Sequence, residues 1–209
     1  MFGKQVFEYF KDNEEIAGIF QRAMTSFSSV TADAVVDAYD FTGIETLVDV
    51  GGGHGALLAA IISKNPDLHG VVFDLPQVVQ GTGANLGELT ARIDIKAGDF
   101  FGSVPEGADA YIMKHIIHDW DDEHCIKIFG NCCSAMTDGG KVLVVDPVVT
   151  DAPESALGKL MDIEMLAIAT GGCERTEEEF EALLERAGLK MSRVVPTQSP
   201  VCIIEAVKA

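Results

Sequence analysis

The spacing of apolar residues changes once along the chain, near residue 45. Before that point apolar side chains recur at intervals of three and four residues, as in Ile16, Ile19 and Phe20. This spacing predicts helices from residue 2 to about residue 40, with a third short helix opening at Thr31. The helices carry much apolar surface for so short a segment, so we expect them to pack on the main domain, on a partner or on a domain outside this chain.

After residue 45, strand-like and helix-like segments alternate, a pattern typical of a parallel sheet with helices on both faces. The sequence predicts strands near 46–50, 70–74, 92–97, 109–113 and 141–146. The helix after the fourth strand opens on the acidic stretch 119–123, and acidic side chains suit a helix N-terminus. A further helix is predicted over about 154–169.

The C-terminal part of the chain ends the sheet in a different way. Thr176 and Glu179 have the spacing of a capping box, and Gly188 stands where a helix that begins there would end. Two strands follow, about 189–195 and 201–207, and so short a connection between them requires an antiparallel hairpin. The predicted fold class is therefore α/β, with a mostly parallel sheet finished by an antiparallel pair.

A glycine-rich turn follows the first strand. Gly51, Gly53 and Gly55 stand between that strand and a helix that Asn65-Pro66 ends, which predicts the first half of a nucleotide-binding βαβ unit. Their spacing differs from the dinucleotide pattern G-x-G-x-x-G because residue 56 is alanine, so we do not expect NAD. Asp49, just before the turn, suits a cationic ligand.

Acidic and imidazole side chains follow the other strands. Asp74 ends the second strand about twenty residues after the glycines, where an acid can bind ribose hydroxyls. His115 and His118 lie at the carboxyl end of the fourth strand, where ligands of open α/β sheets bind, and either is a candidate general base. A structural role is the alternative, and it is stronger for His115. Asp146 and Glu174 are the acids available to hold the His118 ring.

Charge and composition exclude several functions. The formal net charge of −18 comes without a basic patch, so we expect no nucleic-acid partner. No apolar run reaches the roughly 18 residues of a membrane span, and the N-terminus lacks a signal-peptide pattern. The five cysteines include no C-x-x-C pair, which indicates neither a disulfide framework nor a zinc site. We therefore expect a cytoplasmic protein without a bound metal.

Six stretches together resemble the catalytic domain of S-adenosylmethionine-dependent O-methyltransferases of the plant caffeic-acid and isoflavone type, which include bacterial relatives. They are residues 47–55, 72–76, 98–101, 114–120, 140–146 and 171–176, in the family's order. The resemblance implies a Rossmann-like class I methyltransferase fold with a seven-stranded sheet and helices on both faces. It also implies S-adenosylmethionine as the cofactor and S-adenosylhomocysteine as its product.

The resemblance assigns cofactor contacts residue by residue. Gly51 and Gly53 would line the methionine part of the cofactor. The ribose would be held by Asp74, with Leu75 beside it. The adenine would be bound by Asp99 and Phe100, and Lys114 would also lie near it.

The resemblance also assigns the catalytic and acceptor residues. His118 matches the catalytic base, and Glu174 matches one of the two acids that flank it. The other flanking position is commonly Glu but is Asp146 here, and its shorter side chain weakens its expected hold on the imidazole. The acceptor pocket would be lined by Phe20, Met24 and Met165.

Family members usually begin with a helical domain that forms an intertwined dimer. The resemblance therefore implies a helical segment at 1–40 packed on the core, a catalytic domain at 41–209, and a homodimer made through a domain absent from this chain. The expected reaction methylates a hydroxyl of a small acceptor, and we expect that hydroxyl to be phenolic. Two alternatives remain open: a relative that uses the same cofactor for hydroxylation or decarboxylation, and a binding module that has lost turnover.

Overall fold

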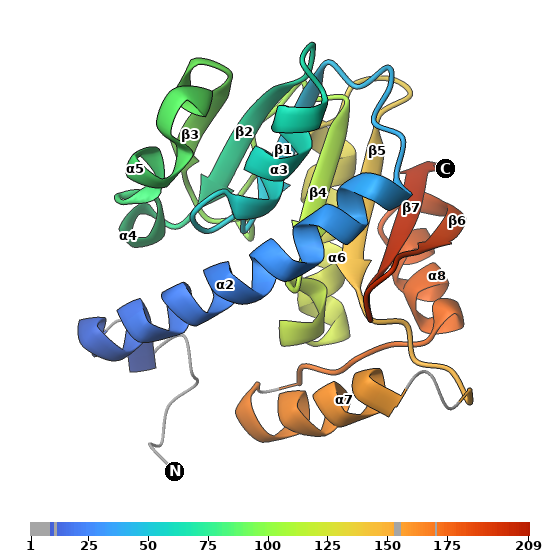
Figure 1. Cartoon of the computed structure of the whole chain (residues 1–209). Helices are drawn as coiled ribbons and strands as arrows, with labels where there is room; N and C mark the ends of the chain where they lie inside the picture. Colours follow the sequence, from blue (N-terminus) through green and yellow to red (C-terminus); the bar gives the residue numbers. More distant parts are fainter. Residues whose placement is uncertain (1–8, 11, 153–155, 170) are drawn as a thin grey trace.

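The computed structural model describes residues 9–10, 12–152, 156–169 and 171–209. Within these residues, one seven-stranded sheet has the order β3-β2-β1-β4-β5-β7-β6 (Figure 1). The strands are β1 Thr46–Val50, β2 His69–Asp74, β3 Ile93–Ala97, β4 Ala110–Lys114, β5 Lys141–Asp146, β6 Leu189–Pro196 and β7 Cys202–Lys208. β1 to β5 pair in parallel, and β7 runs antiparallel to both β5 and β6. The predicted fold class is confirmed, including the C-terminal hairpin.

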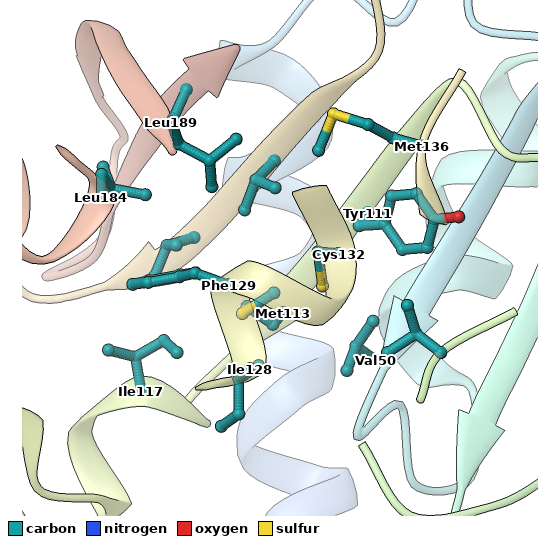
Figure 2. Close-up of a cluster of buried hydrophobic side chains, with 14 of the residues drawn as sticks. Val50, Tyr111, Met113, Ile117, Ile128, Phe129, Cys132, Met136, Leu184 and Leu189 are labelled. Atoms are coloured by element: carbon teal, nitrogen blue, oxygen red, sulfur yellow. The ribbon is translucent and has the colours of Figure 1, made fainter. Parts of the chain in front are cut away.

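Helices cover both faces of this sheet because its central strands are apolar on both sides. In β4, Ala110 and Ile112 pack in one cluster with helices α2 (Glu14–Ala38) and α3 (Ala56–Lys64). Tyr111 and Met113 point to the opposite face, where they meet α6 (Asp122–Ala135) and α8 (Glu177–Arg186) (Figure 2). This alternation is what the two-residue period of a strand dictates when both faces are buried.

The N-terminal segment differs from the prediction. The third short helix expected at Thr31 is wrong, because α2 runs unbroken from Glu14 to Ala38. Its apolar positions continue through Val35, which is fully buried against the core, and this packing favours one unbroken helix across Thr31. The apolar residues predicted at positions 2–8 lie outside the described residues.

The helix after β4 also begins later than predicted. Asp119 belongs to a separate short 3-10 helix, η2 (Ile117–Asp119), and α6 starts at Asp122. Asp121 caps it, because its carboxylate accepts a hydrogen bond of 3.0 Å from the His124 N–H. The capping box of Thr176 and Glu179 at the start of α8 is confirmed.

Within the part of the chain that the structure describes, four short elements were not predicted. Three lie between β2 and β3: α4 (Pro76–Val79), α5 (Thr82–Leu86) and η1 (Gly87–Ala91). The fourth is η2. Helices of three to five residues are too short to show a 3.6-residue period, so the sequence pattern carries no signal for them.

Helix α7 (Ala156–Ile168) leaves apolar side chains open on the surface. Figure 1 shows it below the carboxyl end of β5. Leu160, Ile163 and Leu166 are 63%, 64% and 81% exposed, and Ile16 and Ile19 of α2 are also exposed. Among the described residues, no helix is long and apolar enough to cross a membrane.

Candidate active site

The residues with candidate chemistry gather at the carboxyl ends of the central parallel strands. Gly51 follows β1, Asp74 ends β2, His115 follows β4 and Asp146 ends β5. Because β2, β1, β4 and β5 are neighbours in the sheet, these positions share one edge. In open α/β sheets this edge is where ligands bind.

The loop after β1 requires glycine for its backbone conformation and for its close contacts. Gly51 and Gly53 have φ angles of 69° and 56°, in the left-handed region. A Cβ on Gly51 would overlap the Ile116 side chain, and a Cβ on Gly52 would lie 2.7 Å from the carboxyl carbon of Asp49. At Gly53 an added Cβ would meet no atom within 4 Å, so this position faces open space.

Asp74 ties the end of β2 to the glycine loop. Its carboxylate accepts the Gly53 N–H at 2.8 Å and the Leu75 N–H at 2.6 Å. Thr82 also holds this loop, since its buried hydroxyl donates to the Gly53 carbonyl at 3.1 Å. Burial raises the pKa of Asp74, and the two backbone hydrogen bonds partly offset the effect. Thr82 was missed because it lies in one of the unpredicted short helices.

Asp49 lies beneath the glycine loop and is 2% exposed. Its Oδ2 atom has no hydrogen-bond partner within the described structure. Burial raises the pKa of Asp49 to about 7, while the nearby Lys114 opposes the rise and Asp74 adds to it. A buried, unsatisfied carboxylate is costly, and a cation bound at the loop would lower that cost.

His118 and Glu174 form a buried pair. The His118 Nδ1 lies 2.7 Å from Glu174 Oε1, and both residues are 6% exposed. Burial alone would lower the pKa of His118. The hydrogen bond that His118 donates to Glu174, together with the charges of Asp146 and Asp119, outweighs burial and raises the pKa to about 9. A carboxylate can only accept at Nδ1–H, so Nε2, which lies 3.7 Å from Asp119 Oδ1, is the ring atom that can take another hydrogen-bond partner.

Asp146 contacts His115, so of the two acids expected to be available to the His118 ring it is Glu174 that contacts it directly. Its Oδ1 accepts the His115 backbone N–H at 2.9 Å and lies 3.4 Å from the His115 Nδ1. His115 has a φ of 54°, a strained conformation for a non-glycine residue. Its ring stacks on that of His118 with centroids 5.0 Å apart. Asp146 thus fixes the turn that leads to His118 and acts on the imidazole through its charge.

The same three side chains are a candidate metal-binding group. Ligand atoms of His115, His118 and Asp146 all lie within 4.8 Å of one another, and all three residues are buried. Two imidazoles and one carboxylate are donors that transition metals accept. The expectation that the protein uses no metal stays a prediction.

Asp99 and Phe100 follow β3, and the ring of Phe100 lies 6.2 Å from that of Trp120, centroid to centroid. The exposed Asp99 accepts the Phe101 N–H at 2.9 Å, which closes the turn after β3. The ring of Phe100 borders the loop, since its Cε1 is 3.7 Å from the position of an added Cβ on Gly51. Lys114, at the end of β4, is half-buried, and burial lowers its pKa while Asp146 and Asp49 oppose the shift.

The predicted acceptor residues come from two helices. Phe20 and Met24 lie on α2 and are partly exposed, whereas Met165 on α7 is 6% exposed. Asp162, one turn before Met165, accepts the Glu174 N–H at 2.9 Å. This hydrogen bond joins α7 to the loop that carries Glu174. The acceptor role of all three residues stays a prediction.

Gly172 was missed as a site residue although it lies in one of the resembling stretches. A Cβ on Gly172 would lie 2.6 Å from the His118 carbonyl oxygen. The loop before Glu174 therefore packs directly on the backbone that carries His118. A glycine pair in a sequence signals close backbone approach, but it does not say which distant segment is approached.

Comparison with known proteins finds relatives over most of the chain. The profile of the O-methyltransferase domain matches residues 1–190. Phenazine O-methyltransferase PhzM of Lysobacter antibioticus is 40% identical over 207 residues, covering 98% of this chain and 60% of that protein. Caffeic acid 3-O-methyltransferase of Ammi majus is 42% identical over 194 residues, covering 90% of this chain and 52% of that protein.

A solved structure extends the similarity to three dimensions. It is the O-methyltransferase NcsB1 from neocarzinostatin biosynthesis, in complex with S-adenosyl-L-homocysteine and 1,4-dihydroxy-2-naphthoic acid. It superposes with a TM-score of 0.92 at 31% identity and covers 100% of this chain and 62% of that one. The chain thus spans between half and two thirds of the length of these relatives.

Proposed function

The chain belongs to the O-methyltransferase domain family, and on that basis we propose that it methylates a phenolic hydroxyl of a small acceptor with S-adenosylmethionine. The observation that carries the proposal is the buried His118–Glu174 pair at the sheet edge, next to a glycine loop. The His118–Glu174 pair supplies a base, and the glycine loop supplies a nucleotide site. Methyl transfer to a hydroxyl needs both.

The described residues fit the cofactor. Open space at Gly53 leaves room for a ligand against the loop backbone, and the unsatisfied carboxylate of Asp49 suits its positive charge. We assign Gly51 and Gly53 to the methionine part and Asp74 with Leu75 to the ribose. When bound, the cofactor supplies an electrophilic methyl group on a sulfonium.

The adenine of the cofactor is assigned to residues outside the glycine loop. We assign Asp99, Phe100 and Lys114 to this part, with the Phe100 ring beside Gly51 in position to cover a base. NcsB1, which has the same fold, was crystallised with S-adenosyl-L-homocysteine. This supports a cofactor of the same chemistry here.

His118 is the proposed general base. Its Nδ1–H is held by Glu174, so Nε2 takes the proton of the acceptor hydroxyl as the oxygen attacks. The imidazolium that forms is stabilised by Glu174 and by the charge of Asp146. Proton removal is one part of the rate, and the orientation of the two reactants supplies the rest.

The acceptor is proposed to lie between α2 and α7. Phe20, Met24 and Met165 are apolar, as a pocket for an aromatic ring requires. The named acceptors of the relatives, a phenazine and caffeic acid, are aromatic.

A methyl-transfer assay on a panel of phenols tests the proposed function, and a methylated product from any of them supports it. Cofactor binding without product from any of them would favour the binding module, and a hydroxylated or decarboxylated product would favour the other reaction.

Cofactor binding gives the first prediction. The chain should bind S-adenosylhomocysteine and show no comparable affinity for NAD. Replacing Asp74 by alanine removes hydrogen bonds to a charged group, worth about 1.5–3 kcal/mol each, so the dissociation constant should rise about tenfold or more. Isothermal titration calorimetry measures both.

Asp94→Ala is the matched control for Asp74. Asp94 lies on the neighbouring strand β3, is exposed and contacts only His69 among its recorded partners. Its removal should leave the affinity unchanged. Tight NAD binding with no response to S-adenosylhomocysteine would contradict the assignment of the loop.

The exposed apolar side chains of α7 and α2 give the second prediction. We propose that residues 1–40 and 41–209 are a helical segment and a catalytic domain, and that a dimerisation domain covers this surface in longer proteins. Open apolar patches recruit partners, so this chain should self-associate and turn over phenols slowly. Sedimentation velocity and steady-state kinetics measure the two effects.

Two variants locate the association surface. Changing Ile163 and Leu166 together to serine should shift the sedimentation pattern toward monomer. The control, Glu164→Ser, alters a polar position of the same helix and should leave it unchanged. A compact monomer that methylates a phenol as fast as a full-length relative would show that such a domain is dispensable.

A further inference from the structure

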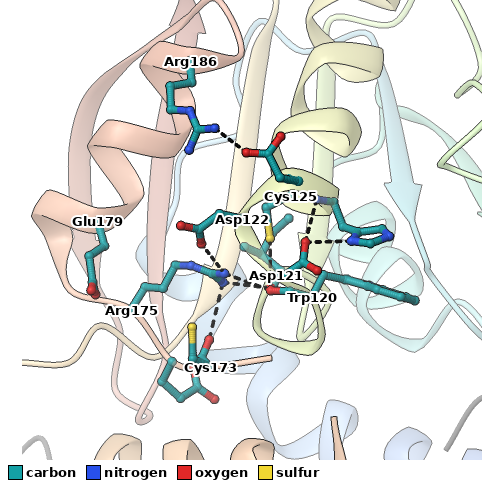
Figure 3. Close-up of polar contacts among 12 residues, drawn as sticks. Trp120, Asp121, Asp122, Cys125, Cys173, Arg175, Glu179 and Arg186 are labelled. Atoms are coloured by element: carbon teal, nitrogen blue, oxygen red, sulfur yellow. Dashed lines mark hydrogen bonds and ion pairs between the residues drawn. The ribbon is translucent and has the colours of Figure 1, made fainter. Parts of the chain in front are cut away.

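Arg175 is a buried arginine whose contacts lie around the proposed base. It is 2% exposed. Its Nη1 donates to the Ile117 carbonyl at 3.0 Å, and its Nη2 donates to the Trp120 carbonyl at 2.8 Å and to Asp122 Oδ1 at 2.9 Å. Figure 3 shows the guanidinium between Asp122 and the Trp120 carbonyl. The guanidinium therefore binds one backbone carbonyl on each side of His118.

Arg175 also belongs to the loop that carries Glu174. Glu174 is its immediate neighbour in sequence, and Arg175 Nη1 also reaches the Cys173 carbonyl at 3.5 Å. The backbone of Arg175 accepts the Val149 N–H at 2.9 Å, just beyond β5. Arg175 thus joins the 3-10 helix of His118, the loop of Glu174 and the segment after Asp146.

Other contacts hold the same backbone in place. The Cys125 Sγ lies 3.3 Å from the Ile117 carbonyl and 3.4 Å from the Trp120 carbonyl, the two groups that Arg175 binds. On the other side, Gly172 leaves no room for a Cβ against the His118 carbonyl. The backbone around His118 is therefore held by donors and by steric contact from independent residues.

The chemistry of this position favours arginine over lysine. Two carbonyls and one carboxylate are bound at once, which needs a planar group with several donors in fixed directions. A lysine ammonium is a single point with three donors and would reach fewer of them. The pair with Asp122 is half open to water, because that side chain is 59% exposed, and open ion pairs contribute little. The two carbonyl contacts are the ones that fix geometry.

We propose that Arg175 is a positioning residue that sets the geometry between His118 and Glu174 by holding the carbonyls of Ile117 and Trp120. The inference rests on the proposed role of His118 as the base. It goes beyond that role, because it names what keeps the base and its carboxylate partner 2.7 Å apart.

Losing this clamp should impair catalysis and leave cofactor binding intact. A misplacement of about 1 Å in an active site can cost about 10²-fold in rate. Arg175→Lys should therefore lower kcat by roughly 10²-fold, with the KM for the acceptor and the affinity for S-adenosylhomocysteine nearly unchanged. The glycine loop and Asp74 are not among the recorded contacts of Arg175.

The pH profile separates positioning from a general loss of structure. The charged groups around His118 are Glu174 from the loop, Asp146 from β5 and Asp119 from its own 3-10 helix, and the ring of His115 stacks on it. With Glu174 displaced, the largest influence that raises the pKa of His118 is weakened. The rise of kcat/KM with pH should then shift to lower pH in Arg175→Lys.

Two control variants isolate the carbonyl contacts. Asp122→Asn removes only the ion pair and should change kcat by less than about threefold, as expected for an exposed pair. Arg186→Lys alters another arginine that pairs with α6, through Glu123 at 2.6 Å and outside the site. It should leave kcat and the pH profile unchanged. If Asp122→Asn lowers kcat as much as Arg175→Lys does, the ion pair and not the carbonyl clamp is responsible, and the proposal is overturned.

A spectroscopic measurement keeps this inference separate from the proposed function. The imidazole NMR signals of His118, assigned with His118→Ala, report its pKa without any turnover. A fall of that pKa in Arg175→Lys supports the clamp even if His118→Ala stays active and the proposed function fails. An unchanged pKa together with an unchanged kcat overturns the proposal that Arg175 positions His118.

If Arg175→Lys does not fold, Gly172→Ala displaces the same loop from the other side. The same loss of kcat and the same pKa shift are expected there, and wild-type values would overturn the proposal.

Discussion

Replacing His118 by alanine should reduce turnover by about 10²–10⁴-fold, the range that general acid–base catalysis contributes. The affinity for S-adenosylhomocysteine should hardly change, because His118 is not among the proposed cofactor residues, which lie on the glycine loop, at the ends of β2 and β4 and just after β3. The loss of turnover is expected because of how the His118 ring is held. Glu174 occupies Nδ1 at 2.7 Å, which leaves Nε2 to take the proton. Single-turnover kinetics and calorimetry measure the two quantities.

His115→Ala is the matched comparison. His115 stacks on His118 and is held by Asp146, but burial lowers its pKa, which makes it the weaker base. Its loss should disturb the neighbouring His118 ring, but it should reduce turnover far less than His118→Ala does. Equal behaviour of the two variants, or an active His118→Ala at neutral pH, would show that the base is assigned wrongly.

The parts of this molecule that follow from local pattern could be predicted from sequence. The strands are apolar runs with a two-residue period, and their limits were predicted to within about one residue. The capping box at Thr176 and the glycines after β1 also depend on neighbours in sequence. Each of these features is decided by residues a few positions apart, so a single sequence contains the information.

The site depended on contacts that no local pattern shows. His118 and Glu174 were selected as candidates, but sequence left open which of Asp146 and Glu174 contacts the His118 ring, because it does not reveal which ring a distant carboxylate meets. Arg175 was passed over for the same reason: its acceptors are backbone carbonyls, which every residue has. The break expected at Thr31 failed because packing on the core outweighs local helix-start preference.

Replacing Glu174 by glutamine tests how the base is prepared for its task, and its effect on turnover should approach that of His118→Ala. An amide can donate a hydrogen bond to Nδ1, which favours the tautomer that carries its proton on Nε2. That tautomer cannot take the proton of an acceptor hydroxyl. In the serine protease triad the equivalent change costs about 10⁴-fold, and we expect a loss on the order of 10²–10⁴-fold here, measured as kcat.

The same substitution should change the pH dependence of stability in a defined direction. The folded protein raises the pKa of His118 from 6.5 to about 9. Its ion pair with Glu174 therefore stabilises the fold fully below pH 6.5, and this stabilisation is lost as the pH rises through about 9. In Glu174→Gln the pKa should fall toward 6.5, so urea unfolding from pH 6 to 10 should show a smaller loss than wild type. If Glu174→Gln lost as much stability as wild type between pH 6 and 10 and kept its turnover, Glu174 would neither set the pKa of His118 nor orient its ring.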